Sequence, residues 1–380
     1  MSLSFAVTPE QDEFRKVVRD FADRVIAPVA GDLARRGEFP SHIVRQMGAM
    51  GLFGIPFEED WGGMGGDFLT LCLALEEIGR VDQALGVTLS AGVGLGAAPL
   101  HQFGTEEQKQ RWLPELCRGE KIAAFGLTES HGGSDNWGTT RTRAMQDGDE
   151  WVINGSKAFI TNAGTDMTSI VTVTAWTGDG EMTAIIVPVD TPGLTIAAPY
   201  DKVGWHHSDT REIFFDDVRV PMANTLGERG AGLRQFLSTL DDGRIAISAV
   251  AVGLIQGCVD ECTRYANERE AFGKTIGSHQ AVAFKIADME VAAQTARHVY
   301  WNAAWLRAEG LPYKKEAAIA KLYSSEQAVT VARQASQVFG GMGFMTETRV
   351  GRFYQDAKIL EIGEGTSEMQ RMIISRELGL

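Results

Sequence analysis

Ile170-Val171-Thr172-Val173-Thr174, near the middle of a chain of 380 residues, is a run of β-branched residues. Such residues favour strands, and three later segments are also rich in β-branched and aromatic residues: Ala184-Ile185-Ile186-Val187, Glu212-Ile213-Phe214-Phe215 and Val218-Arg219-Val220. Turn-forming residues bound them, namely Asp147-Gly148-Asp149, Gly178-Asp179-Gly180 and Thr191-Pro192-Gly193. Residues 121-229 are therefore predicted to form an antiparallel β-sandwich or barrel domain.

The regions on either side of this domain have the composition of helices. On the N-terminal side, Thr8 before Pro9 is the expected helix cap, and an apolar stripe at helical spacing follows: Phe14, Val17, Val18, Phe21 and Val25. On the C-terminal side, good helix formers dominate three long segments, 245–269, 280–308 and 315–339. The sequence thus predicts an α+β, mostly α, fold with a helical N-terminal domain (1-120), the central β-domain (121-229) and a helical C-terminal domain (230-380).

Charge and composition exclude several classes of protein. The net charge is −14, with 36 basic and 50 acidic residues, and such an acidic chain repels the phosphate backbone of nucleic acids. Polar residues interrupt every apolar run, so no membrane-spanning segment is expected. Residues 1–20 lack the pattern of a signal or transit peptide, which predicts a cytoplasmic protein. The four cysteines, which we expect to be buried free thiols, show no metal-binding spacing: Cys72, Cys117, Cys258 and Cys262.

Two further motifs do not predict a site. Gly92-Val93-Gly94-Leu95-Gly96-Ala97 fits the G-x-G-x-x-A pattern of dinucleotide-binding proteins, but that pattern requires a strand before it and a βαβ unit around it. Helical sequence flanks this match, so we expect a close-packed helix rather than a nicotinamide site. His206-His207 lies in a polar loop without a completing ligand, and both histidines are expected at the surface.

The segment Ile362-Gly363-Glu364-Gly365-Thr366-Ser367-Glu368-Met369-Gln370-Arg371 places one carboxylate between two glycines. Glycine adds no side-chain bulk, so a large flat partner can approach Glu364 closely. A carboxylate in such a position suits a general base. Taken alone, the segment fits a glycine-rich turn with a solvated glutamate at least as well.

Two segments of the central region offer groups that suit a flat, phosphate-bearing ligand. Phe125-Gly126-Leu127-Thr128-Glu129-Ser130-His131-Gly132-Gly133-Ser134-Asp135 runs from a strand into a loop with hydroxyls and exposed N–H groups. Gly155-Ser156-Lys157-Ala158-Phe159-Ile160-Thr161-Asn162-Ala163 puts an aromatic ring beside a hydroxyl. Each segment alone is equally well explained as an ordinary turn or a core strand.

Taken together and in order along the chain, these segments resemble the acyl-CoA dehydrogenase family. The other matching motifs are Gly51-Leu52-Phe53-Gly54-Ile55-Pro56 with Trp61-Gly62-Gly63, Arg269-Glu270-Ala271-Phe272-Gly273-Lys274 with Gln280, and Gln337-Val338-Phe339-Gly340-Gly341-Met342-Gly343. Leu240-Asp241-Asp242-Gly243-Arg244-Ile245 is most similar to the short-chain (butyryl-CoA) type and its bacterial relatives. The resemblance implies FAD, a C-terminal four-helix bundle, a homotetramer built as a dimer of dimers, and electron transfer to an electron-transfer flavoprotein.

The resemblance also assigns roles to individual residues. Those implied to line the flavin ring and its phosphate edge are Phe125, Leu127, Thr128, Gly133 and Ser134, with Phe159, Ile160 and Thr161 on the other side of the ring. Those implied to meet the FAD of a neighbouring subunit are Arg269, Phe272, Ile276, Gln280, Gln337, Gly340 and Gly341. Thr366 and Glu368 match further cofactor positions, and the implied acyl-CoA contacts are Ser134, Asp241, Arg244 and Gly365.

Glu364 matches the catalytic base of the family. It is implied to take the pro-R α-proton of a saturated acyl thioester while the β-hydride passes to the flavin, and the trans-2-enoyl thioester forms. Some branched-chain members carry the base at the position of Gly243, which has no side chain here. Gly363 stands where tyrosine is common, Gln355 where arginine is frequent and Ala271 where a hydroxyl residue is common. These departures leave the acyl chain length and some cofactor contacts open.

Several alternatives share part of this pattern. An acyl-CoA oxidase or a related flavin monooxygenase would react with O₂, and an acyl-carrier-protein thioester dehydrogenase would use another carrier. The Gly-Glu-Gly-Thr setting of Glu364 argues against the monooxygenase. A non-catalytic acyl-CoA-binding protein would not need an intact base together with the flavin motifs.

Overall fold

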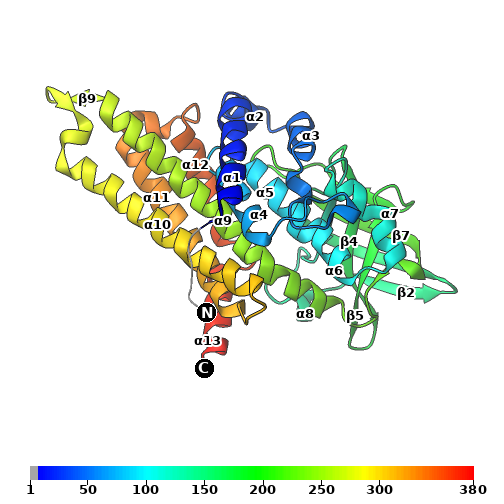
Figure 1. Cartoon of the computed structure of the whole chain (residues 1–380). Helices are drawn as coiled ribbons and strands as arrows, with labels where there is room; N and C mark the ends of the chain where they lie inside the picture. The colour runs from blue at the N-terminus through cyan, green and yellow to red at the C-terminus, as the bar shows by residue number, and fades with distance from the viewer. Residues whose placement is uncertain (1–6) are drawn as a thin grey trace.

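The computed structural model describes residues 7–380 and has helices at both ends of the chain and strands between them (Figure 1). Helices precede the sheet: α1 (Pro9–Phe21), the π-helix η1 (Ala22–Ile26), α2 (Ala30–Arg36), α3 (Ser41–Ala49), η2 (Leu52–Gly54), η3 (Glu59–Trp61), α4 (Phe68–Gly79), α5 (Gln83–Ser90), the π-helix η4 (Ala91–Ala97), α6 (Ala98–Phe103) and α7 (Glu106–Cys117). The mostly helical fold with a central sheet is the one predicted.

The start of α1 follows the expected capping chemistry. The Thr8 hydroxyl accepts from the backbone N–H of Gln11 at 3.2 Å, and the Gln11 side chain accepts from the N–H of Thr8 at 2.9 Å. The apolar stripe is confirmed at Val18, which is fully buried, but it is wrong at Val17, which is 50% exposed. Helix α1 packs on α4 along the face that carries Val18, so its neighbour Val17 is turned toward solvent.

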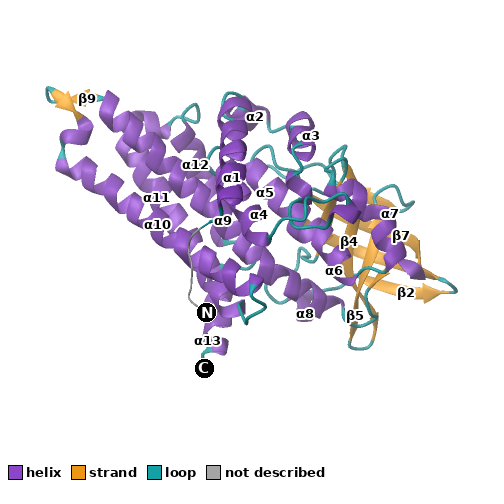
Figure 2. Cartoon of the chain, viewed as in Figure 1, coloured by secondary structure: helices purple, strands orange, loops and turns teal. Residues whose placement is uncertain are grey.

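Among the described residues, eight strands form one sheet at one end of the molecule (Figure 2). They are β1 (Ile122–Gly126), β2 (Arg143–Asp147), β3 (Glu150–Thr161), β4 (Thr168–Gly178), β5 (Glu181–Pro188), β6 (Leu194–Ile196), β7 (Thr210–Pro221) and β8 (Thr225–Leu226), with the short helix α8 (Asn136–Thr139) between β1 and β2. The predicted strand segments lie in β4, β5 and β7. The pairing is not purely antiparallel as predicted, because β1 and β2 both pair with β4 in parallel.

The C-terminal helices pack together at the other end of the molecule. They are α9 (Gly232–Glu268), α10 (Gln280–Ala308), α11 (Lys314–Phe339), α12 (Arg349–Ala357) and α13 (Ser367–Glu377), with the hairpin strands β9 (Glu270–Ala271) and β10 (Lys274–Thr275) and the short 3₁₀ segments η6 (Ile276–Ser278), η7 (Gly340–Phe344) and η8 (Lys358–Glu361). Helix α9 packs against α4, α10 and α11. Buried ion pairs and hydrogen bonds join the two helical regions, since Arg297 and Tyr300 of α10 donate to Glu76 of α4 at 2.9 and 2.6 Å.

Two helical stretches correct the expectation that no segment is long and apolar enough to cross a membrane. The stretches Gln83–Phe103 and Gly232–Glu268 both pass a test of length and composition, yet 83% of each apolar window is buried inside the protein. Core helices of soluble proteins pass the same test. All four cysteines are buried free thiols, as predicted.

Candidate active site

Glu364 lies in a tight turn between η8 and α13. Its φ is 55° and that of Gly365 is 94°, so two consecutive residues adopt the left-handed region. A non-glycine residue in this region carries strain that the surrounding structure must hold. Thr366 ends the turn by capping α13, because its hydroxyl accepts from the N–H of Met369 at 3.3 Å. The turn therefore fixes the direction of the Glu364 side chain.

The Glu364 carboxylate points into a gap at Gly243 of α9. A Cβ atom placed on Gly243 would lie 2.5 Å from Oε2 of Glu364 and 3.6 Å from the Leu95 side chain of η4. The carboxylate thus occupies the space that any side chain at position 243 would need. Three segments that are far apart in the sequence, around residues 95, 243 and 364, meet here.

The electrostatic setting of Glu364 suits a base that works near neutral pH. Burial raises the pKa of Glu364 to about 7, while the nearby charges of Lys321 and Arg244 oppose this shift. Its Oε2 atom is buried and has no hydrogen-bond partner among the described residues. Arg244 is itself buried and forms an ion pair with Asp241. An unpartnered carboxylate oxygen with such a pKa can accept a proton from a bound molecule.

The raised pKa predicts how stability depends on pH. Glu364 binds its proton more tightly in the folded than in the unfolded chain, so its contribution to stability is complete below its ordinary pKa of 4.5 and is lost as the pH rises through about 7. Glutamine at this position does not titrate. As the pH rises from 4.5 to about 7, the unfolding free energy of Glu364→Gln should therefore increase by up to about 3 kcal/mol relative to that of wild type. Chemical denaturation of both proteins across this range measures it, and parallel pH curves would contradict it.

The two central segments singled out in the sequence lie next to each other. The N–H of Ala158 in β3 donates to the carbonyl of Thr128 at 2.9 Å, and the buried Lys157 ammonium donates to Leu127 and Glu129 at 3.2 and 2.8 Å. Leu127 is buried in the core, and Ile160 belongs to the core of the sheet. Because the Ile160 side chain is buried in this core, only the backbone of Ile160 is available to a ligand.

An exposed aromatic ring stands out between these segments. Phe159 has φ 60°, is 62% exposed and stacks on Tyr200 with ring centroids 5.3 Å apart. Phe125 at the end of β1 instead packs on Phe236 of α9 at 3.9 Å. Thr128 is half-buried, whereas Gly133 and Ser134 lie exposed in the loop after β1. An uncovered ring beside exposed backbone and hydroxyl groups fits a flat ligand that carries polar edges.

A second group of predicted cofactor residues lies at the opposite end of the molecule, near the β9–β10 hairpin (Figure 1). Phe272 in the hairpin is 96% exposed, and Cβ atoms placed on Gly340 or Gly341 would meet nothing within 4 Å. The side chains of Arg269, Gln280 and Gln337 are exposed, and Ile276 is half-buried. One chain does not bring this group together with Phe159. Thr366 and Glu368, by contrast, lie close to Glu364, two and four residues after it in the chain.

Sequence reasoning missed or misplaced several residues. Lys321 and Leu95 lie close to Glu364 but were not singled out as site residues; Leu95 belongs to the Gly92–Ala97 segment, which forms a π-helix and holds no strand. His207 is not at the surface as predicted: it is buried, and its Nε2 lies 2.9 Å from Asp82. Its neighbour Asp209 is also buried, because the loop folds back against the helical region.

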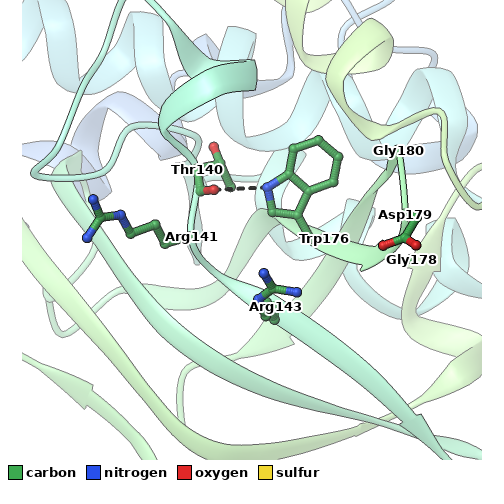
Figure 3. Close-up of a pocket in the computed structure, with 7 residues that line it drawn as sticks. All are labelled: Thr140, Arg141, Arg143, Trp176, Gly178, Asp179 and Gly180. Atoms are coloured by element: carbon green, nitrogen blue, oxygen red, sulfur yellow. Dashed lines mark hydrogen bonds between the residues drawn. The ribbon is translucent and has the colours of Figure 1, made fainter.

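A hollow of about 420 Å³ on the sheet domain is shown in Figure 3. Trp176 forms one wall and donates from its indole N–H to the carbonyl of Thr140 at 2.9 Å, and the guanidinium groups of Arg141 and Arg143 extend nearby. None of the residues predicted for the site lines this hollow. Its size therefore carries no information about the chemistry at Glu364.

Comparisons with known proteins cover the whole chain. Family models match in order: Acyl-CoA dehydrogenase, N-terminal domain (residues 8–120), middle domain (124–218) and C-terminal domain (230–379). The probable acyl-CoA dehydrogenase YngJ of Bacillus subtilis is 50% identical over 99% of this chain and 100% of its own length.

Two solved structures are similar over nearly their full length. The butyryl-CoA dehydrogenase of Megasphaera elsdenii has a TM-score of 0.96 and 39% identity, and 100% of both chains is covered. A chain in a structure of the electron transferring flavoprotein of Acidaminococcus fermentans, studied for flavin-based electron bifurcation, has a TM-score of 0.96 and 38% identity over 99% of each chain.

Proposed function

This chain belongs to the acyl-CoA dehydrogenase family, and we propose that it desaturates short-chain acyl-CoA thioesters with Glu364 as the base that removes the α-proton. Members of this family are FAD-dependent oxidoreductases that act on the CH–CH bond of an acyl-CoA. The observation that carries the assignment of the base is the buried, unpartnered Oε2 of Glu364 facing Gly243.

The residues present fit FAD. The exposed ring of Phe159, the hydroxyls of Thr128 and Ser134 and the open glycines Gly340 and Gly341 suit a flat ring and a pyrophosphate. When bound, FAD supplies the acceptor for the hydride that leaves Cβ. Phe125, Leu127, Gly133, Ile160, Thr161, Thr366 and Glu368 remain proposed contacts, as do Ser134, Asp241, Arg244 and Gly365 for the thioester.

The chain's own part in the reaction is proton removal. The α-proton of a thioester is weakly acidic, so its removal needs a correctly placed base and donors where charge develops on the thioester oxygen. Glu364 accepts the proton at Oε2, and we assign its backbone N–H as one donor to the thioester oxygen. The pKa of about 7 leaves a large fraction of Glu364 ionised at neutral pH.

We further propose an assembly of four chains. The β9–β10 hairpin with its exposed Phe272 lies at the opposite end of the molecule from the sheet that contains Phe159 (Figure 1). This separation within one chain, together with the exposure of Arg269, Gln280 and Gln337, supports completion of each cofactor site by a second copy. The domain borders at residues 120 and 229, a cytoplasmic location and an electron-transfer flavoprotein as electron acceptor are proposed alongside it. The similarity to the chain from Acidaminococcus fermentans supports the acceptor.

Acyl chain length can be tested with a thioester series from butyryl to palmitoyl. A Cβ placed on Gly363 would have only the Ile359 carbonyl near it, at 3.5 Å, so the structure leaves room for a side chain at this position. Each buried methylene contributes about 0.8 kcal/mol, so kcat/KM should rise by roughly fourfold per carbon until the pocket is full. We expect the optimum at short to medium straight chains, and Gly363→Tyr should move it toward shorter ones. An optimum at palmitoyl would refute the proposal.

Assays with a dye acceptor, with O₂ and with thioesters of an acyl carrier protein decide which electron acceptor and which acyl carrier the enzyme uses. Turnover of acyl-CoA with a dye acceptor, and slow reaction of the reduced enzyme with O₂, are expected for a dehydrogenase. Fast reaction with O₂ would identify an oxidase. A strong preference for thioesters of an acyl carrier protein would move the proposal to that carrier.

A further inference from the structure

Two buried polar side chains donate hydrogen bonds to the turn that carries Glu364. Gln370 of α13 donates from Nε2 to the carbonyl oxygens of Glu364 and Gly365 at 3.3 and 2.8 Å. Lys321 of α11 donates from Nζ to the same Gly365 carbonyl at 2.7 Å. Both side chains are fully buried. The strained backbone at Glu364 is thus fixed through its carbonyl groups rather than through the carboxylate.

The burial of Lys321 is not explained by packing. Moving an ammonium group out of water is costly, and an apolar side chain of similar length would fill the space without that cost. Among the described residues its one hydrogen bond goes to the Gly365 carbonyl, so no carboxylate pairs with it directly. A buried charge that bonds only to the backbone of the catalytic turn indicates a role in that turn.

The charged groups around Lys321 come from three other elements. They are Glu364 and Glu361 from the segment before α13, Glu368 at the start of α13, and Arg244 of α9. Burial lowers the pKa of Lys321 to about 8, so it stays mostly protonated at neutral pH. Its charge favours the ionised form of Glu364, and Arg244 acts in the same direction.

We propose that Lys321 is a positioning residue for Glu364, which holds the left-handed turn through the Gly365 carbonyl and sets by its charge the pH at which the carboxylate becomes a base. Gln370 is the second side chain that holds this turn by hydrogen bonds, and it is neutral. This inference rests on the proposed role of Glu364. The two side chains that hold the turn differ in what they supply: Lys321 contributes a hydrogen bond and a charge, whereas Gln370 contributes hydrogen bonds alone.

The test compares Lys321→Gln, Lys321→Arg and Gln370→Leu in the FAD-loaded, full-length protein. The first readout is the titration of the Glu364 carboxyl by infrared difference spectroscopy without substrate, with Glu364→Gln as the reference that identifies the band. The second is the pH dependence of flavin reduction in a single turnover. Lys315→Gln is the matched control, since Lys315 lies on the same helix and its side chain is 38% exposed.

Loss of the charge should move the Glu364 titration and the acid limb of the rate profile upward by about one to three pH units in Lys321→Gln. Lys321→Arg should restore both to near wild type, because the charge is kept. Gln370→Leu should lower the rate with an unshifted limb, and Lys315→Gln should change neither readout. A purely structural lysine would lower the melting temperature and leave the titration where it was, which would overturn the proposal.

The outcomes also separate this inference from the proposed function. If Glu364→Gln still reduced flavin at the wild-type rate, the base assignment would fail, yet the infrared titration would still report whether Lys321 controls Glu364. If Lys321→Gln were not recovered as folded protein, Lys321→Met would decide, because an apolar side chain of similar length fills the same space without the charge. An upward shift of the Glu364 titration in that variant supports the proposal, and an unchanged titration overturns it.

Discussion

Glu364→Gln should retain FAD and bind acyl-CoA while its turnover falls by at least about 10²–10⁴-fold, the usual effect of removing a general base. The amide keeps the shape of the carboxylate, so the side chain still fits the gap at Gly243. It cannot accept the α-proton, and the charged groups that act on Glu364 are the cations Lys321 and Arg244, which cannot serve as the base. Single-turnover reduction of the flavin by acyl-CoA measures the effect without interference from the electron acceptor.

Glu368→Gln is the matched control for this prediction. Glu368 lies four residues after Glu364 and is exposed in the first turn of α13. Its replacement should weaken cofactor or partner contacts and leave proton removal largely intact. Near wild-type flavin reduction in Glu364→Gln, or an equal loss in both variants, would show that the base lies elsewhere.

The sequence predicted the architecture well where a pattern was local. The β-branched runs correspond to β4, β5 and β7, and the segment 280–308 coincides with α10. Strand and helix propensities are read from neighbouring residues, so these assignments need no long-range information. The parallel pairing of β1 and β2 with β4 was not predictable in this way, because it depends on which strands meet across the chain.

The same limit applies to the site. Glu364 could be proposed as the base from the sequence because its glycine-flanked motif is local and resembles a known family. Lys321 was not, since a lysine in an alanine-rich helix usually reads as a surface residue, and only the folded chain brings it to the Gly365 carbonyl. His207 was misassigned for the matching reason: a polar loop predicts exposure, yet its partner Asp82 is distant in the sequence.

Gly243→Ala should slow the reaction without unfolding the protein. The added Cβ would lie 2.5 Å from Oε2 of Glu364, which is the end of a flexible side chain and can move. A displacement of about 1 Å from the reactive geometry can cost about 10²-fold in rate. Alanine is also the better helix former by about 1 kcal/mol. We therefore expect a loss of about 10²-fold in flavin reduction together with an unchanged or higher melting temperature.

Gly253→Ala on the same helix provides the contrast that makes this prediction sharp. A Cβ at Gly253 would lie 2.4 Å from the backbone carbonyl of Glu76 in α4 and 2.6 Å from the backbone nitrogen of Arg80. Neither atom can move without separating α4 from α9, so this variant should lose stability. Rate loss with stability kept at position 243, and stability loss at position 253, would together show that Gly243 is required for the placement of the base. A wild-type rate in Gly243→Ala would mean that the carboxylate does not need the gap, and that Oε2 reaches the substrate from another position.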